Sequence, residues 1–104
     1  MRIEYEDEKE IKQHIIRTIA RYLDLSLYKV FMFGSRVNQK GDERSDIDIG
    51  IQGAQKIPLE TMAKIREAIE ELPILYKIDV IDFADVSEKF KHVALKNIEE
   101  ISIV

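Results

Sequence analysis

The sequence contains no cysteine, and only two prolines and four glycines are found among its 104 residues. Without cysteine the chain can form no disulfide framework, no thiolate zinc site and no cysteine nucleophile. Small secreted domains are commonly stabilised by disulfides, so their absence favours an intracellular, cytoplasmic protein.

Long hydrophobic runs and surplus positive charge are also missing. No apolar stretch approaches the roughly 18 residues that a membrane span needs, and the first residues, MRIEYED, lack the apolar core of a signal peptide. Sixteen basic side chains stand against 20 acidic ones, which gives a net charge of −4. Binding to phosphate backbones depends on lysine and arginine, so neither a membrane nor direct contact with nucleic acid is expected.

No stretch rich in glycine, serine or proline divides the chain, and no internal repeat is visible. With 45% hydrophobic and 35% charged residues, the composition is that of a globular domain. A chain of this length can bury roughly 60–70% of its unfolded surface, which suffices for a single core. We therefore expect one domain over residues 1–104 and conclude that something else must help to hold any large substrate.

Hydrophobic periodicity predicts three helices and three strands. Isoleucines at 11, 15 and 19 recur at helical spacing, whereas residues 46–51 alternate strictly between two faces. The order α-β-β-α-β-α is typical of an α/β or α+β fold with one small mixed sheet. The predicted helices span about 7–24, 58–73 and 87–97, the predicted strands span 28–33, 46–51 and 77–83, and a short apolar segment follows at 101–104.

Two carboxylates share one face of the second predicted strand. Asp46 and Asp48 are separated by one residue, which places their Cβ atoms about 6–7 Å apart on the same side. Like charges this close are commonly held by a cation, and carboxylate oxygens favour Mg²⁺ or Mn²⁺. A bare Asp-x-Asp is more typical of an edge strand with a solvated acidic face, so the pair alone does not indicate a metal site.

Two better-known motifs are absent. An EF-hand beginning at Asp46 would need glycine at Ile51 and glutamate at Ile57. No Gly-x-x-x-x-Gly-Lys run exists, which excludes a P-loop.

A glycine and a serine end the first predicted strand. Gly34 would let backbone N–H groups approach phosphate oxygens closely, and the Ser35 hydroxyl adds a donor. If Arg36 opens a helix, the N–H groups of its first turn form an anion site, and the guanidinium could clamp a phosphate.

Together these residues form a recognisable pattern. The stretch GSRVNQKGDERSDIDIGI places Asp-x-Asp ten residues after Gly-Ser, and Asp79 lies in the last predicted strand. This closely resembles the signature of the DNA polymerase β-like nucleotidyltransferase superfamily, in particular its minimal nucleotidyltransferase branch. The resemblance covers about half the chain, from Val30 to Phe83. It implies the nucleotidyltransferase fold, with a small mixed sheet packed against helices.

The resemblance also implies a role for each motif residue. Asp46 and Asp48 correspond to the metal ligands that bridge the nucleotide triphosphate, and Gly34 and Ser35 to the turn that holds its phosphates, with Arg36 beside them.

A third carboxylate completes the implied site. Asp79 corresponds to the acid beside the attacking hydroxyl, although Asp82 is a rival because KIDVID offers two acids. Alternation sends these two side chains to opposite faces, and the family places its acid early in the strand, which favours Asp79. One departure concerns the loop, where Asn38 and Gln39 stand in place of an arginine and a glycine found in many relatives.

The implied reaction is attack of a hydroxyl on the α-phosphorus of a nucleoside triphosphate, with two Mg²⁺ ions neutralising the charge that develops. Members this small resemble the MNT antitoxins of HEPN/MNT modules. Their implied activity is transfer of AMP from ATP to a tyrosine of the HEPN toxin. Two alternatives stay open at this point: an antitoxin that neutralises the toxin by contact alone, and nucleotidyl transfer to a small molecule.

Overall fold

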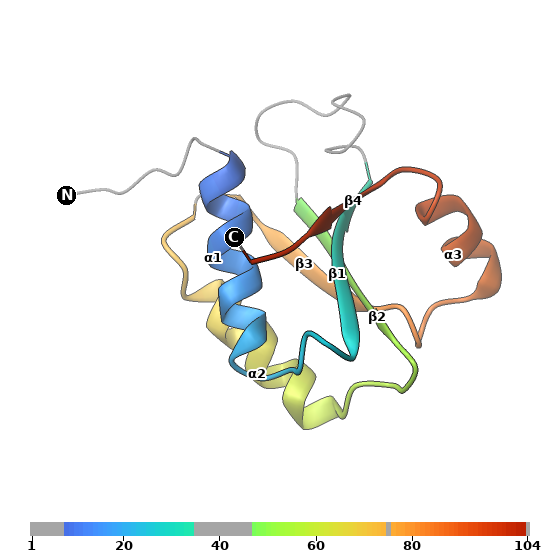
Figure 1. Ribbon diagram of the computed structural model, residues 1–104, viewed down its shortest axis with the longest axis horizontal. Helices are drawn as coiled ribbons and strands as arrows, with labels where there is room; N and C mark the ends of the chain where they lie inside the picture. Colours follow the sequence, from blue (N-terminus) through green and yellow to red (C-terminus); the bar gives the residue numbers. More distant parts are fainter. Residues whose placement is uncertain (1–7, 35–46, 75, 104) are drawn as a thin grey trace.

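The computed structural model describes residues 8–34, 47–74 and 76–103 and shows an α+β fold with one small mixed sheet, as the sequence predicts (Figure 1). None of the helices within these ranges has the length and apolar character needed to cross a membrane. In chain order the elements are α1 (Glu8–Ala20), β1 (Tyr28–Phe33), β2 (Ile47–Gly53), α2 (Leu59–Glu70), β3 (Ile78–Asp82), α3 (Glu88–Ala94) and β4 (Ile98–Ile101).

The four strands form one sheet in the order β3-β2-β1-β4. β1 pairs antiparallel with both β2 and β4, whereas β2 and β3 are parallel. A parallel pair needs a crossover connection, and α2 supplies it between β2 and β3. β3 is therefore the outermost strand on one side of the sheet.

Helices cover the two faces of the sheet unequally. α1 and α2 lie on one face and α3 lies on the other (Figure 1). The larger core lies between the sheet and the first two helices, where Ile15, Ile49 and Ile65 are completely buried. A smaller core under α3 is built from phenylalanines. The central strand β1 therefore has buried residues on both faces, which explains its largely apolar sequence.

Several boundaries differ from the prediction. α1 ends at Ala20 rather than near Asp24, because Asp24 instead forms a turn in which its carboxylate accepts hydrogen bonds from the backbone and hydroxyl of Ser26. Ser87 caps α3 as predicted, accepting a hydrogen bond from the Phe90 N–H. α3 ends at Ala94, and the chain then forms β4, a strand that the sequence did not predict.

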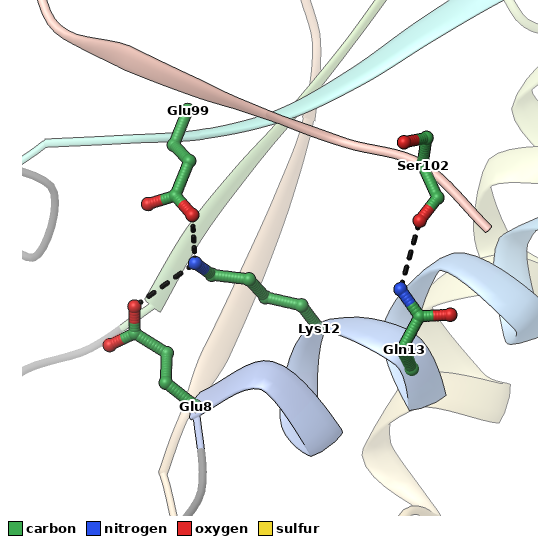
Figure 2. A network of polar contacts seen from close by, with 5 residues as sticks. All are labelled: Glu8, Lys12, Gln13, Glu99 and Ser102. Carbon is green, nitrogen blue, oxygen red and sulfur yellow. Dashed lines mark hydrogen bonds and ion pairs between the residues drawn. The ribbon is translucent and has the colours of Figure 1, made fainter. Parts of the chain in front are cut away.

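Lys12 joins α1 to β4. Its ammonium group contacts the Glu99 carboxylate and pairs with Glu8 at 3.1 Å, while the Gln13 amide donates to the Ser102 carbonyl at 2.8 Å (Figure 2). Partial burial lowers the pKa of Lys12, but hydrogen bonds and attraction from Glu99 and Glu8 outweigh this effect, and the pKa is raised above its usual value. These contacts hold the C-terminal strand against α1.

Candidate active site

Asp48 and Asp79 lie side by side on neighbouring strands. Asp48 of β2 is the register partner of Asp79 of β3 in the parallel pair. Register partners in adjacent strands point to the same face, and adjacent strands lie about 4.8 Å apart. Both residues are half-buried. The fold thus brings two carboxylates, far apart in the sequence, to one place on the face opposite α1 and α2.

Gly34, directly after β1, lies against the Asp48 carboxylate. Its neighbour Phe33 is the register partner of Asp48 in β1. A Cβ atom on Gly34 would lie 2.6 Å from Oδ2 of Asp48, and the glycine has a φ of +90°. Only glycine adopts such a backbone without strain, and only a residue without a side chain leaves room for the carboxylate. The bend that ends β1 and the carboxylate of β2 are therefore in direct contact.

Three predicted site residues lie outside the described residues: Ser35, Arg36 and Asp46. Asn38 and Gln39, which depart from the family pattern, fall in the same segment. The roles predicted for these residues stay predictions.

The donors of the described site fit a hard divalent cation. Asp48 and Asp79 offer carboxylate oxygens at one level of the sheet, the ligand type that Mg²⁺ and Mn²⁺ prefer. No group of three or more acidic, histidine or cysteine side chains suited to a metal occurs among the described residues. With Asp46, predicted on the same face as Asp48, the set would number three.

Asp82 has a structural role on the other side of the sheet. It pairs in register with Ile51, which faces the larger core, and only 3% of its surface is exposed. Its two carboxylate oxygens accept the backbone N–H groups of Ile57 at 2.8 Å and Ala84 at 2.9 Å. Asp82 therefore fixes the loop before α2 and the turn after β3, and Asp79 is the acid of β3 that shares a face with Asp48.

A block of aromatic rings lies behind Asp48 on the same face. The Phe31 and Phe83 rings meet edge to face with centroids 4.9 Å apart, and Phe33 meets Phe83 at 5.2 Å. Gly50, two residues after Asp48, makes room for them, since a Cβ atom there would lie 2.5 Å from the Phe31 ring. These aromatic residues and Gly50 were not among the predicted site residues. The alternation Asp48-x-Gly50 gave a signal, because it places a glycine beside the carboxylates on one face.

A cavity of about 490 Å³ opens beside Asp79, between the second half of α2 and β3. Its wall includes Asp79 itself, the apolar side chains of Ile69 and Leu72, and Arg66. The Arg66 guanidinium donates two hydrogen bonds to the Val80 carbonyl, at 3.2 Å from Nε and 2.9 Å from Nη2. Asp79 therefore borders a space large enough for a side chain or a short peptide segment.

Comparison with known proteins finds a matching family and a relative. Residues 13–102 match the family model described as polymerase beta, nucleotidyltransferase. The chain is 31% identical over 90 residues to the Haemophilus influenzae protein named probable protein adenylyltransferase MntA, a match that covers 86% of this chain and 78% of that protein.

Two solved structures have a similar fold. A chain from the complex of the tri-AMPylated Shewanella oneidensis HEPN toxin with MNT antitoxin superposes with a TM-score of 0.70 at 14% identity, covering 93% of this chain and 73% of that one. A toxin–antitoxin crystal structure with AMP-PNP gives a TM-score of 0.65 at 18% identity, covering 89% and 73%. At these identities the likeness shows a shared fold.

Proposed function

The chain belongs to the polymerase β nucleotidyltransferase family, and we propose that it transfers AMP from ATP to a tyrosine hydroxyl of a HEPN-domain toxin, acting as its antitoxin. The observation that carries this proposal is the register pairing of Asp48 with Asp79, beside a Gly34 bend that contacts the Asp48 carboxylate. A relative named as a probable protein adenylyltransferase, and a similar fold found with an AMPylated HEPN toxin, support the choice of donor and acceptor.

Mg²⁺ is the metal that we assign to the site. Asp46, Asp48 and Asp79 would bind two Mg²⁺ ions, the number that the family resemblance implies. When bound, Mg²⁺ neutralises the negative charge that develops on the transferring group and on pyrophosphate. The described donor set fits this assignment, because carboxylate oxygens at one level of the sheet are hard ligands.

The other catalytic roles, phosphate positioning and activation of the hydroxyl, fall to separate residues of the chain. Gly34, with the predicted contributions of Ser35 and Arg36, would position the phosphates of ATP beside Asp48. The tyrosine oxygen forms a bond to the α-phosphorus while the bond to pyrophosphate breaks, and we assign Asp79 to orient the hydroxyl and accept its proton. In such transfers positioning and electrostatics account for most of the acceleration, which a small scaffold can provide.

The test is incubation with ATP labelled at the α-phosphate, Mg²⁺ and the product of the adjacent gene. We expect label on the partner's tyrosine, and its loss in Asp48→Asn. Asp85→Asn is the matched control, because Asp85 is an exposed carboxylate that pairs with Lys56 outside the site. Neutralisation of the partner without label, unimpaired in Asp48→Asn, would contradict transfer and favour an antitoxin that acts by contact.

A further inference from the structure

The cavity beside Asp79 runs along the outer edge of the sheet. It touches all five consecutive residues 77–81. Successive side chains of a strand point to opposite faces, so a cavity in contact with every one of them lies along the strand's edge rather than over one face. β3 is the outermost strand of the sheet, and no strand within residues 8–34, 47–74 and 76–103 pairs with its outer edge. We call the space between this edge and α2 the edge groove.

Backbone polar groups of β3 point into the edge groove. The Lys77 carbonyl accepts a hydrogen bond from the Ile47 N–H, and the Phe83 N–H donates one to the Ile51 carbonyl. The odd-numbered residues of this segment therefore direct their backbone N–H and C=O groups toward β2. The alternate residues, Ile78 and Val80, direct their N–H and C=O groups outward. Arg66 binds the Val80 carbonyl and so covers the far end of this edge. The other outward groups, those of Ile78 and the Val80 N–H, flank Asp79 in the strand.

The order of the site residues across the sheet bears on where ATP and the acceptor protein would lie. The Gly34 bend follows β1, Asp48 lies on β2 and Asp79 on β3, with the edge groove beyond it. In phosphoryl transfer the attacking and leaving oxygens lie roughly in line on opposite sides of the phosphorus. If the phosphates of ATP lie at the Gly34 bend, the acceptor must approach from the β3 side, where the groove begins.

We propose that the edge groove binds an extended segment of the acceptor protein, which adds to β3 as a further strand; this inference rests on the function proposed above. Strand addition to an open edge is a common mode of peptide recognition. A residue of that segment in register with Asp79 would direct its side chain to the face that carries Asp48. The apolar wall of Ile69, Leu72 and Ile74 would receive apolar side chains on either side of the acceptor hydroxyl.

A bulky side chain placed in the groove tests this inference. Glu70 lines the groove and is exposed on α2, so Glu70→Trp fills the space without disturbing the core. Glu67→Trp is the matched control, because Glu67 is exposed on the same helix and does not line the groove. The measurement is KM and kcat for transfer from α-labelled ATP to the adjacent gene's product, with thermal melting to verify folding.

We expect Glu70→Trp to raise KM for the partner protein about tenfold or more, a loss of roughly 1.4 kcal/mol in binding, with KM for ATP unchanged. Glu67→Trp is expected to match the wild type. An unchanged KM for the partner would overturn the groove assignment alone, and a raised KM for ATP instead would show that the groove holds the nucleotide. Absence of any label with the wild-type protein would overturn the proposed function, and the inference with it.

Discussion

Asp48 and Asp79 are register partners on adjacent parallel strands, whereas Asp82, only three residues after Asp79, pairs with Ile51 on the opposite face. The two acids of β3 therefore have separate roles. One belongs to the candidate active site, and the other fixes two turns of the fold.

Substitution of Asp79 is expected to lower activity without affecting stability. In Asp79→Asn, kcat for AMP transfer should fall about 10²–10³-fold, the range found when one preorganised electrostatic group is removed from an active site. Because Asp79 is half-buried and faces the site, the free energy of unfolding should stay within about 0.5 kcal/mol of wild type. Kinetics with labelled ATP and urea denaturation measure the two effects.

Substitution of Asp82 is expected to have the opposite effect. Asp82→Ala leaves the backbone N–H groups of Ile57 and Ala84 without their acceptor and should lower the free energy of unfolding by about 1–3 kcal/mol. At a temperature where the variant is folded, binding of ATP should be retained. A variant of normal stability that no longer binds ATP would contradict this division of roles.

At Gly34, steric and backbone effects can be separated. Gly34→Val should lose AMP transfer and also stability, by about 1–3 kcal/mol, because it places a branched residue at positive φ. Gly34→Asn should lose less stability, since asparagine tolerates this conformation better. Its Cβ atom would still meet the Asp48 carboxylate, so transfer should remain impaired. Full activity of Gly34→Asn would refute the contact between the bend and the carboxylate.

Gly50 tests the aromatic block. In Gly50→Ala the new methyl group would meet the Phe31 and Phe83 rings, and overpacking of this kind costs about 1–3 kcal/mol. In the double variant Gly50→Ala/Phe31→Leu, the loss in free energy of unfolding should be smaller than the sum of the two single losses, because the smaller leucine side chain makes room for the methyl group. Denaturation curves for the single and double variants check this coupling, and purely additive losses would argue against it.

Lys12 gives a pH dependence of stability. Its pKa is raised in the folded state, so the ammonium form stabilises the fold below the pKa of the unfolded chain, and this contribution is lost as the pH rises through the folded pKa. Lys12→Met should therefore be less stable than wild type at neutral pH, and the difference should narrow at strongly alkaline pH. Urea denaturation of both proteins across this range measures the effect. A constant difference would show that the ion pairs with Glu99 and Glu8 are not its source.

The sequence predicted elements well where the pattern is strong and local. Residues 28–33 form β1 over the predicted span, because the apolar run at 30–33 reflects burial on both faces. β4 escaped prediction since its residues, IEEI, are largely exposed and become a strand only through pairing with β1. The predicted end of α1, near Asp24, was wrong. Leu23 continues the helical spacing, but the hydrogen bonds of the Asp24 carboxylate to Ser26 favour a turn instead.

The candidate site was predictable in part. Alternation within β3 separates the faces of Asp79 and Asp82, and the structure agrees. Alternation within one strand does not reveal which residue of the next strand lies beside it. The pairing of Asp48 with Asp79 could therefore be seen only in the structure. The edge groove was equally hidden, because it depends on β3 being outermost and on α2 lying beside it.

The most direct test of the account is Mn²⁺ binding followed by electron paramagnetic resonance, in the presence of an ATP analogue that cannot be cleaved at the α-phosphate. Wild-type protein should bind Mn²⁺ tightly together with the analogue, and Asp48→Asn/Asp79→Asn should lose this binding while keeping its melting temperature. If the folded double variant bound Mn²⁺ as tightly as wild type, the two register partners would not be metal ligands, and the proposed site would be wrong.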